Sequence, residues 1–386
     1  MFASIGLALH VEVHAEELAL TTVALTGDAA PGTGDTFAGF IGSGALDAAG
    51  RVAFAARTTT GQGIWRQDPG LGKVAVTGDS APGTAAAFAI FPGSPGLGDL
   101  GTAFFAGLTG GGQGVWKQGP GLAKVAVTGD AAPGTATSFS AFRVPAVNNL
   151  GHAAINGRLN GGGAGVWKES SVLSKVAVTG DSAPGTARAF TLLDDPPAIN
   201  DSDHTAFKGT TLDGSGIWKE SPALGKVAVA GDAAPGTSST FFSFGNPALN
   251  DLDHTSFIGF LSTGPTGIWK ENPTLGMVTA VGAAAPGTTK TFSGFRDAPF
   301  LNNSGHVAFF AELTGGDDGI WAEDRFGALS LVVRSGDDIE VRPGDFRTIR
   351  SLLVAGLQDR LRALQETWVH GSSSAAGRVA HVSRRG

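Results

Sequence analysis

Five aspartates recur at one position of a repeating sequence, and they are the first residues whose chemistry attracts attention. They are spaced 51 residues apart, and Ala283 fills the sixth position. They are Asp28, Asp79, Asp130, Asp181 and Asp232. Carboxylate oxygens are ligands that Ca²⁺ prefers, so carboxylates along one rim of a ring would suit calcium. Alternatively, each carboxylate accepts backbone N–H bonds from the turn that follows it. No other cofactor is expected.

A second group of polar residues lies where the repeats differ most from one another. These residues occupy nearly equivalent positions but are chemically unlike: Arg143, Asp194, Asp195, Asn246, Arg296 and Asp297. Loops at equivalent positions of a circular repeat array converge on one face, where binding residues tend to lie. The sequence therefore predicts a binding face, with unconstrained drift of loop sequences as the alternative.

Histidines form a third series at equivalent positions: His152, His204, His254 and His306. Neutral imidazoles can ligate metals, but no second ligand recurs beside them. We therefore interpret them as solvated residues at the starts of strands. The sequence contains no Gly-x-Ser-x-Gly, His-Glu-x-x-His or Walker lysine motif, and no catalytic residue is assigned.

The elements that must position these residues belong to units of 51 residues. Six Ala-Pro-Gly-Thr tetrapeptides follow one another at this spacing, and tryptophan recurs with them. The prolines are Pro31, Pro82, Pro133, Pro184, Pro235 and Pro286. The tryptophans are Trp65, Trp116, Trp167, Trp218, Trp269 and Trp321. A fixed period of this length indicates a solenoid, a propeller or a similar array.

Each unit reads as four short strands. In the third unit these are residues 124–128, 139–142, 152–159 and 166–168, separated by turn-forming residues. Ala132-Pro133-Gly134-Thr135 suits a type II turn, because proline fixes φ at the second position and glycine accepts positive φ at the third. Four strands in about 50 residues match a propeller blade. We expect an all-β propeller in which Trp, Phe and Val are buried where blades stack.

The ends of the repeat suggest how the ring closes. Residues 13–20 occupy the position of a last strand, and Leu331 to Asp337 resemble a first strand, so we expect seven blades closed by the N-terminal strand, with six as the alternative. The repeat domain then spans residues 13–350. Residues 1–12 are an N-terminal segment for which a signal-peptide remnant is one interpretation, although a basic start is missing and His10 and Glu12 interrupt the apolar stretch. Residues 351–386 are an atypical Arg-rich tail, interpreted either as a specialised tail or as a degenerate last blade.

One motif is specific enough to indicate a family. Asn302 to Phe309 reads Asn-Asn-Ser-Gly-His-Val-Ala-Phe, and Asp47 to Phe54 and Asn200 to Phe207 match with substitutions. The chain thus resembles the bacterial tandem-repeat proteins defined by the motif NxxGxxAF, whose members carry varied surface anchors. The resemblance covers roughly residues 13–350 and implies export and display at a cell surface, with no established activity. No sorting helix or lipid-attachment cysteine is visible.

Composition narrows the classes of function. The net charge of −7 gives no basic surface for nucleic acid, and no apolar run approaches the roughly 18 residues of a membrane span. The absence of cysteine excludes disulfides and thiolate metal sites. We expect a monomeric, non-enzymatic extracellular or cell-surface scaffold that binds a protein or glycan through one propeller face. The alternatives are a propeller glycoside hydrolase or polysaccharide lyase with Asp194 or Asp195 as its acid, and an inactive fragment of a longer array.

Overall fold

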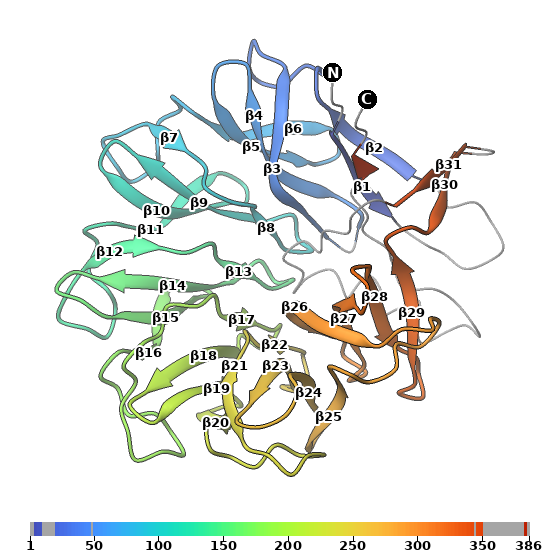
Figure 1. Ribbon diagram of the computed structural model, residues 1–386. Helices are drawn as coiled ribbons and strands as arrows, with labels where there is room; N and C mark the ends of the chain where they lie inside the picture. Colours follow the sequence, from blue (N-terminus) through green and yellow to red (C-terminus); the bar gives the residue numbers. More distant parts are fainter. Residues whose placement is uncertain (1–3, 10–19, 48, 343–344, 350–381, 384–386) are drawn as a thin grey trace.

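All regular elements that the structure describes are β-strands. The computed structural model describes residues 4–9, 20–47, 49–342, 345–349 and 382–383. Within them, six antiparallel sheets follow one another along the chain and stand side by side around a common centre (Figure 1). This confirms the all-β class and the repeated blade-like sheets. No helix in the described part is long and apolar enough to cross a membrane.

We number the six sheets I to VI in chain order. Sheet I comprises β3 (Phe37–Leu46), β4 (Val52–Thr58), β5 (Gln62–Gln67) and β6 (Leu71–Val76); sheet II comprises β7 (Phe88–Ile90), β8 (Gly96–Leu97), β9 (Ala103–Thr109), β10 (Gly112–Gln118) and β11 (Leu122–Val127). Sheet III comprises β12 (Phe139–Phe142), β13 (Ala146–Val147), β14 (Ala153–Leu159), β15 (Ala164–Glu169) and β16 (Leu173–Val178); sheet IV comprises β17 (Ala198–Ile199), β18 (Thr205–Thr211), β19 (Gly214–Glu220) and β20 (Leu224–Val229). Sheet V comprises β21 (Phe241–Phe244), β22 (Ala248–Leu249), β23 (Thr255–Leu261), β24 (Gly267–Glu271) and β25 (Leu275–Ala280); sheet VI comprises β26 (Phe292–Leu301), β27 (Val307–Leu313), β28 (Asp318–Glu323) and β29 (Leu329–Arg334).

The sheets are offset by one strand from the units expected from the sequence. The strand expected to open the third unit, residues 124–128, overlaps β11 and pairs with β10 of the preceding sheet. A short turn at 119–121 joins these two strands, and short connections make antiparallel neighbours. The longer segment with Ala-Pro-Gly-Thr instead crosses to the next sheet. For the same reason Leu331 lies in β29 and ends sheet VI rather than opening a seventh unit.

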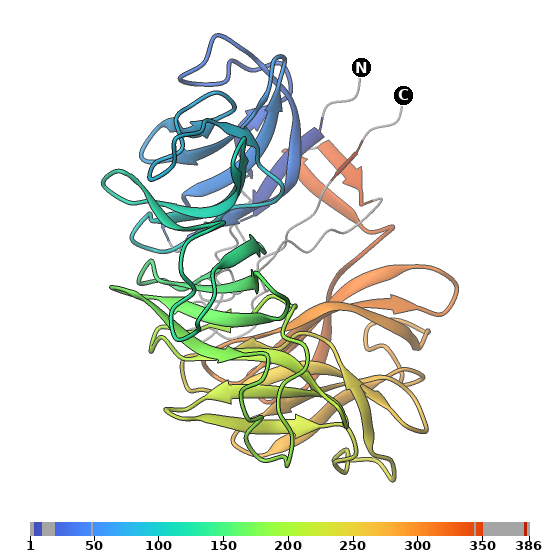
Figure 2. The same ribbon diagram turned by 90° about the vertical axis from the view of Figure 1, so that its left-hand side faces the viewer.

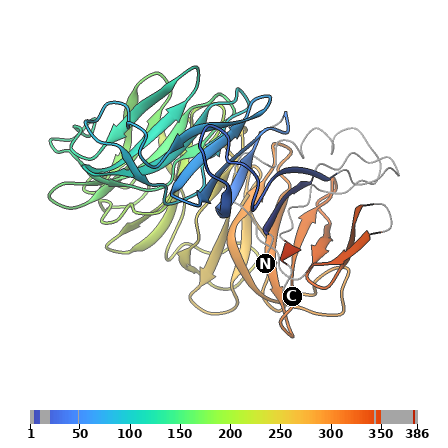
Figure 3. The same cartoon turned by 90° about the horizontal axis from the view of Figure 1, so that it is seen from above.

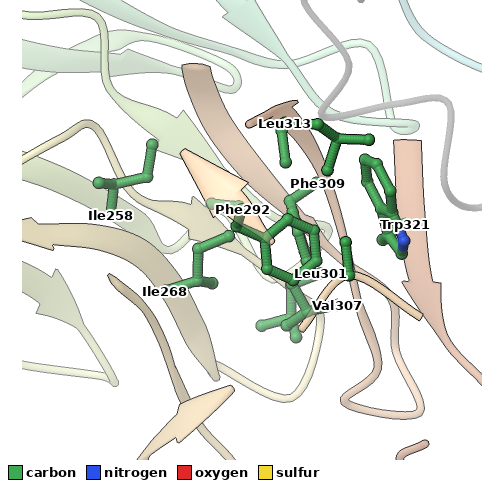
Figure 4. Close-up of a cluster of buried hydrophobic side chains, with 11 residues drawn as sticks. Ile258, Ile268, Phe292, Leu301, Val307, Phe309, Leu313 and Trp321 are labelled. Atoms are coloured by element: carbon green, nitrogen blue, oxygen red, sulfur yellow. The ribbon is translucent and has the colours of Figure 1, made fainter. Parts of the chain in front are cut away.

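The hydrophobic core lies between adjacent sheets, and an Ile/Val-Trp dipeptide serves both sides of each sheet. In sheet V, Trp269 faces sheet IV and packs with Ile217, whereas Ile268 faces sheet VI and packs with Trp321. Figure 4 shows this second cluster, in which Ile258 and Ile268 meet the side chains of sheet VI. Alternate residues of a strand point to opposite faces, so neighbouring residues reach different interfaces. The repeated tryptophans are therefore core residues, as expected.

Each repeated tryptophan also makes one hydrogen bond that fixes the crossover into its own sheet. Its indole Nε1–H donates to the carbonyl of the proline in the preceding Ala-Pro-Gly-Thr turn, at 3.0 Å in every sheet. The turn itself has the expected form: Gly134 has φ +72°, and the N–H of Thr135 donates to the Ala132 carbonyl at 3.1 Å. The turn and the tryptophan thus hold each other in place.

Buried asparagines form a second link between sheets. Nδ2 of Asn148 donates to the Asn200 carbonyl at 2.8 Å, Asn200 donates to Asn250 at 2.9 Å, and Asn250 donates to Asn302 at 2.9 Å. The Oδ1 atom of each of these four asparagines accepts the backbone N–H four residues later and so closes its own turn. The first position of the NxxG motif therefore joins sheets III to VI in a ladder.

Strands from near the two ends of the chain lie together beside sheets I and VI. Strands β1 (Ser4–Leu9), β2 (Leu20–Leu25) and β32 (Val382–Ser383) form a small antiparallel sheet with β1 in the middle. Strands β30 (Asp338–Arg342) and β31 (Asp345–Thr348) form a hairpin after sheet VI. Figures 2 and 3 show both groups near each other, between sheets I and VI. Most of the N-terminal strand expected at 13–20, and the tail at 351–386 apart from β32, fall outside the described residues.

We predict that Trp167→Phe lowers the free energy of unfolding by about 1–3 kcal/mol, because the carbonyl of Pro133 loses its donor and the buried ring becomes smaller. Urea unfolding of the full chain measures this change. Phe326→Ser is the control, since Phe326 is 79% exposed and its loss should cost less than about 0.5 kcal/mol. Equal stability of the two variants would contradict the structural role of the indole hydrogen bond.

Candidate functional site

Short bulges interrupt the innermost strand of each sheet and place the variable polar residues there. In sheet III, β12 and β13 both pair with β14, and residues 143–145 leave the ladder between them. Pro145 ends this bulge, and a proline cannot donate to a strand ladder. Prolines take the same place in sheets II, IV, V and VI: Pro95, Pro197, Pro247 and Pro299.

Bulges of adjacent sheets lie close together, and we call this series the bulge band. It consists of residues 42–44, 91–95, 143–145, 193–197, 245–247 and 297–299. A Cβ added to Gly93 of sheet II would lie 2.8 Å from Val144 of sheet III. Arg143 of sheet III reaches Asp194 of sheet IV. Two of the six residues expected to bind a partner are thus brought into direct contact.

Three side chains form an arginine–aspartate cluster at the junction of sheets III and IV. The Asp194 carboxylate accepts a hydrogen bond from Nη2 of Arg143 at 3.0 Å. Arg158, on β14, donates from Nε at 3.0 Å to the other oxygen and also donates from Nη2. Such a two-pronged guanidinium–carboxylate contact fixes the relative orientation of both groups. Arg158 is a site residue that sequence reasoning missed.

The electrostatics of the cluster keep Asp194 ionised. The hydrogen bond from Arg158 lowers the pKa of Asp194 below its ordinary value, and Arg143 adds to this effect against the opposing effect of partial burial. The same contact raises the pKa of Arg158. A general acid in glycoside hydrolysis needs a raised pKa so that it holds a proton at neutral pH. Asp194 therefore does not fit the role of a catalytic acid.

A second ion pair lies in sheet IV and adds no net charge. Nζ of Lys208 lies 3.2 Å from Asp195, the residue after Asp194. Lys208 pairs with Ile217, which packs against sheet V, so this ion pair lies on the face of sheet IV away from sheet III. The cluster of Arg143, Arg158 and Asp194 by itself has two positive charges and one negative charge, a net charge of +1.

A buried asparagine positions both sides of this junction. Asn156 is fully buried, and its Nδ2 donates to the Leu193 carbonyl, directly before Asp194, at 2.6 Å. Its own backbone carbonyl accepts the N–H of Arg143 at 3.1 Å. Sequence reasoning missed this residue too, although the sequence carries a signal, because no equivalent position of the other sheets is an asparagine. The equivalent positions in the other sheets are Ala55, Ala106, Lys208, Ile258 and Phe310.

Of the remaining candidates, Asn246 and Asp297 lie in the bulges of sheets V and VI, and Arg296 is the last paired residue before the bulge of sheet VI. Arg296 pairs with Glu312 of its own sheet and stands over the Phe310 ring, 5.6 Å from its centroid. Asp297 adopts φ +58°, in the left-handed region, and Asn246 is half-buried between Gly245 and Pro247. Among the described residues, none of the three is bonded to Arg143 or Asp194. The structure therefore brings together Arg143 and Asp194, with Asp195 adjacent, and leaves the other three apart.

The five repeated aspartates are engaged locally. In each of them Oδ2 accepts the backbone N–H of the residue three positions earlier, at 2.8–3.0 Å. In four of them a lysine of the preceding strand also contacts the carboxylate. The backbone donor thus lies in the preceding strand and not in the following turn. Within the described part of the chain no three His, Cys, Asp or Glu residues are grouped as metal ligands. Calcium binding by these residues stays a prediction.

The repeated histidines lie in the joints between sheets, where they are half-buried rather than fully solvated. Nδ1 of His152 contacts Asp203 of the next sheet at 2.8 Å, and His204 contacts Asp253 in the same way. Asp203 and Asp253 stand where other repeats have glycine, and both adopt positive φ. Burial lowers the pKa of His254 and His306.

Comparisons with known proteins find one family and several distant folds. A family model described as "Family of unknown function (DUF7453)" matches residues 11–365. No curated protein matches the chain.

Three solved structures illustrate the distant similarities. The β-propeller domain of the trilobed protease from Pyrococcus furiosus is 9% identical, with a TM-score of 0.36 over 77% of this chain and 98% of that one. A protein from Lactobacillus plantarum is 14% identical, with a TM-score of 0.40 over 86% and 96%. The six-bladed fucose-recognising lectin of Aleuria aurantia is 10% identical, with a TM-score of 0.34 over 75% and 93%. All three scores lie below 0.5, so these structures say nothing about the ligand or reaction of this chain.

We predict that acidification destabilises the fold through His254 and His306. Their pKa values in the folded chain lie below the ordinary value of about 6.5, so below that pH the unfolded chain binds more protons. Above pH 6.5 both imidazoles are neutral in the folded and the unfolded chain, and they cost the fold nothing. The free energy of unfolding then decreases as the pH falls from 6.5 toward their folded-state pKa values. The melting temperature, measured from pH 8 to pH 5, should therefore fall.

The double variant His254→Gln/His306→Gln should show a flatter dependence of melting temperature on pH. The melting temperature of each protein is expressed as its change from the value at pH 8. This removes the destabilisation that the two substitutions cause at every pH. Parallel curves for the variant and the unaltered chain would contradict the assignment to these histidines.

Proposed function

Because the chain belongs to DUF7453, a family of unknown function, we propose a role from its own residues: a non-enzymatic scaffold that binds a protein or glycan partner through the bulge band. We place it outside the cell or at its surface, as the NxxGxxAF resemblance implies, and as a monomer without a nucleic-acid partner. Calcium at the repeated aspartates would be an accessory of this scaffold.

The observation that carries this proposal is where the repeats vary. One position, buried or half-buried, stays apolar in all six sheets: Phe40, Phe91, Phe142, Leu193, Phe244 and Phe295. The next position differs in character: Ile41, Pro92, Arg143, Asp194, Gly245 and Arg296. Drift alone would not pair both Arg143 and Arg158 of sheet III with one carboxylate, Asp194 of sheet IV. A partner-binding surface supplies a reason for the polar side chains to be retained together.

We infer that the ring holds seven sheets, the last shared by both chain ends. In each of the six crossovers, a Gly N–H donates to a Phe carbonyl at 2.8 Å, as Gly282 does to Phe292. After sheet VI, Gly336 donates to Ile349 at 2.7 Å, which gives Ile349 the place of the phenylalanine that opens a sheet. At the other end β2 lies 51 residues before β6, the outer strand of sheet I, and pairs with β1 and through it with β32. These contacts support a seventh sheet with strands from both ends.

We predict that a disulfide forms between cysteines placed at Ile5 and Val382. These residues face each other in the β1–β32 pairing, and the chain has no cysteine of its own. Ile5→Cys/Val382→Cys should run faster on a non-reducing gel and melt at a higher temperature than after reduction. Ile5→Cys alone is the control. Failure to form the crosslink under mild oxidation would contradict a sheet shared by both ends.

We predict that partner binding depends on the two arginines of the cluster. Glycan and protein arrays probed with the full chain should give signals that Arg143→Ala/Arg158→Ala reduces at least about tenfold, the factor that corresponds to about 1.4 kcal/mol. Arg188→Ala is the matched control, because Arg188 is 48% exposed and pairs with Asp213 at 2.9 Å. Signals that survive the double substitution, or that Arg188→Ala removes equally, would contradict this binding face.

A further inference from the structure

We propose that the junction of sheets III and IV binds an acidic side chain of a partner protein, while aliphatic side chains beside it receive the apolar residues that flank this acid. This inference rests on the proposed scaffold function and names the kind of partner. It is carried by the unused donors of the arginine–aspartate cluster, by the charge of the junction and by the side chains around it.

The cluster has many hydrogen-bond donors that it does not use. Each guanidinium has five N–H donors. Arg143 donates one bond to Asp194 and Arg158 donates two, so seven of the ten donors remain. The two side chains are 49% and 54% exposed, so these donors face solvent. Asp194 holds both guanidiniums in place before a ligand arrives, which reduces the entropy lost on binding.

The charge of the junction selects an acidic group. Two arginines face one carboxylate in the cluster there, although the whole chain carries −7. The charged pair at the bulge of sheet VI, Arg296 with Glu312, is neutral overall. A carboxylate can take the paired N–H groups of an arginine in two parallel bonds, which a neutral amide does not reproduce.

The neighbouring side chains favour a protein over a glycan. Val144 follows Arg143 directly, and Leu192 lies two residues before Asp194; both are large, aliphatic and exposed. Sugars pack best on aromatic rings, whereas protein interfaces combine apolar side chains with arginine. The exposed series continues at Ile90 in sheet II and at Phe260 in sheet V.

The register shows that these residues share one level of the ring. Ile90 pairs with Leu108 in sheet II, and Ala141 pairs with Arg158 in sheet III. Leu192 bridges to Thr210 in sheet IV, and Ser243 pairs with Phe260 in sheet V. Along four neighbouring sheets this level is thus apolar, charged, apolar and aromatic. An extended peptide with one acid between apolar residues matches this order.

The test is a selection of displayed random octapeptides on the folded full chain, in parallel on Arg143→Ala/Arg158→Ala and on the control Arg188→Ala. Peptides enriched by the unaltered chain and by the control should carry Asp or Glu next to Leu, Ile, Val or Phe. Their affinity, measured by fluorescence anisotropy, should fall at least about tenfold on the double variant, and equally when the acid of the peptide is replaced by its amide. Leu192→Ser should weaken binding but keep its dependence on the acid.

Two measures keep the result decisive. Arg158→Lys retains the charge but not the two-pronged geometry; it should bind with intermediate affinity and substitutes for the double variant if that variant fails to fold. Oligogalacturonate, a carboxylate-bearing glycan, is titrated in the same way. Arginine-dependent binding of the glycan without enriched acidic peptides would overturn the protein partner but leave the scaffold function standing. If neither ligand binds, or binding ignores both arginines, the inference and the scaffold function fall together.

Discussion

The hydrogen bond from each tryptophan to the proline of the preceding turn is the contact on which the repeat depends. Tryptophan is large enough to fill the space between two sheets, but its buried N–H requires an acceptor. The carbonyl of Pro133, and of its equivalents, supplies that acceptor and lies in the segment that crosses from one sheet to the next. Packing between sheets and the path of the chain are therefore fixed by the same residue. This explains why the tryptophan and the Ala-Pro-Gly-Thr turn recur with the same period.

Around this constant framework one junction differs in chemistry. Most interfaces between sheets are apolar, as in the cluster of Ile268 with Phe292 and Trp321. Between sheets III and IV, the inner part of the interface instead holds Asn156, Arg158 and Asp194. A polar interface contributes less hydrophobic stabilisation than the apolar ones beside it, and the neighbouring identical joints can tolerate that loss. Repetition thus lets one junction diverge in sequence while the other sheets maintain the fold.

Much of the fold could be predicted from the sequence because its signals are local. The type II turn needs only proline and glycine at fixed positions, and the alternation in residues such as 124–128 identifies a strand without further context. What could not be predicted depends on partners distant in the chain. That strand belongs to the preceding sheet because the short turn at 119–121 joins it to β10. Counting four strands in each repeat did not take the length of this turn into account. The aspartates were correctly considered as acceptors of backbone N–H groups, but the donor proved to lie three residues before and not after.

The candidate site shows the same division. Arg143 and Asp194 could be identified as departures from the repeat, yet their contact spans 51 residues and needed the arrangement of sheets. Arg158 and Asn156 escaped notice because a single strand does not reveal which neighbour each face meets. The asparagine ladder has a further implication, since every rung runs from an amide of one sheet to a carbonyl of the next in chain order. Removing the last sheet of the series would leave an asparagine amide without its acceptor. Removing the first sheet would leave an asparagine carbonyl without its donor. Lengthening or shortening such an array by engineering therefore calls for different caps at its two sides.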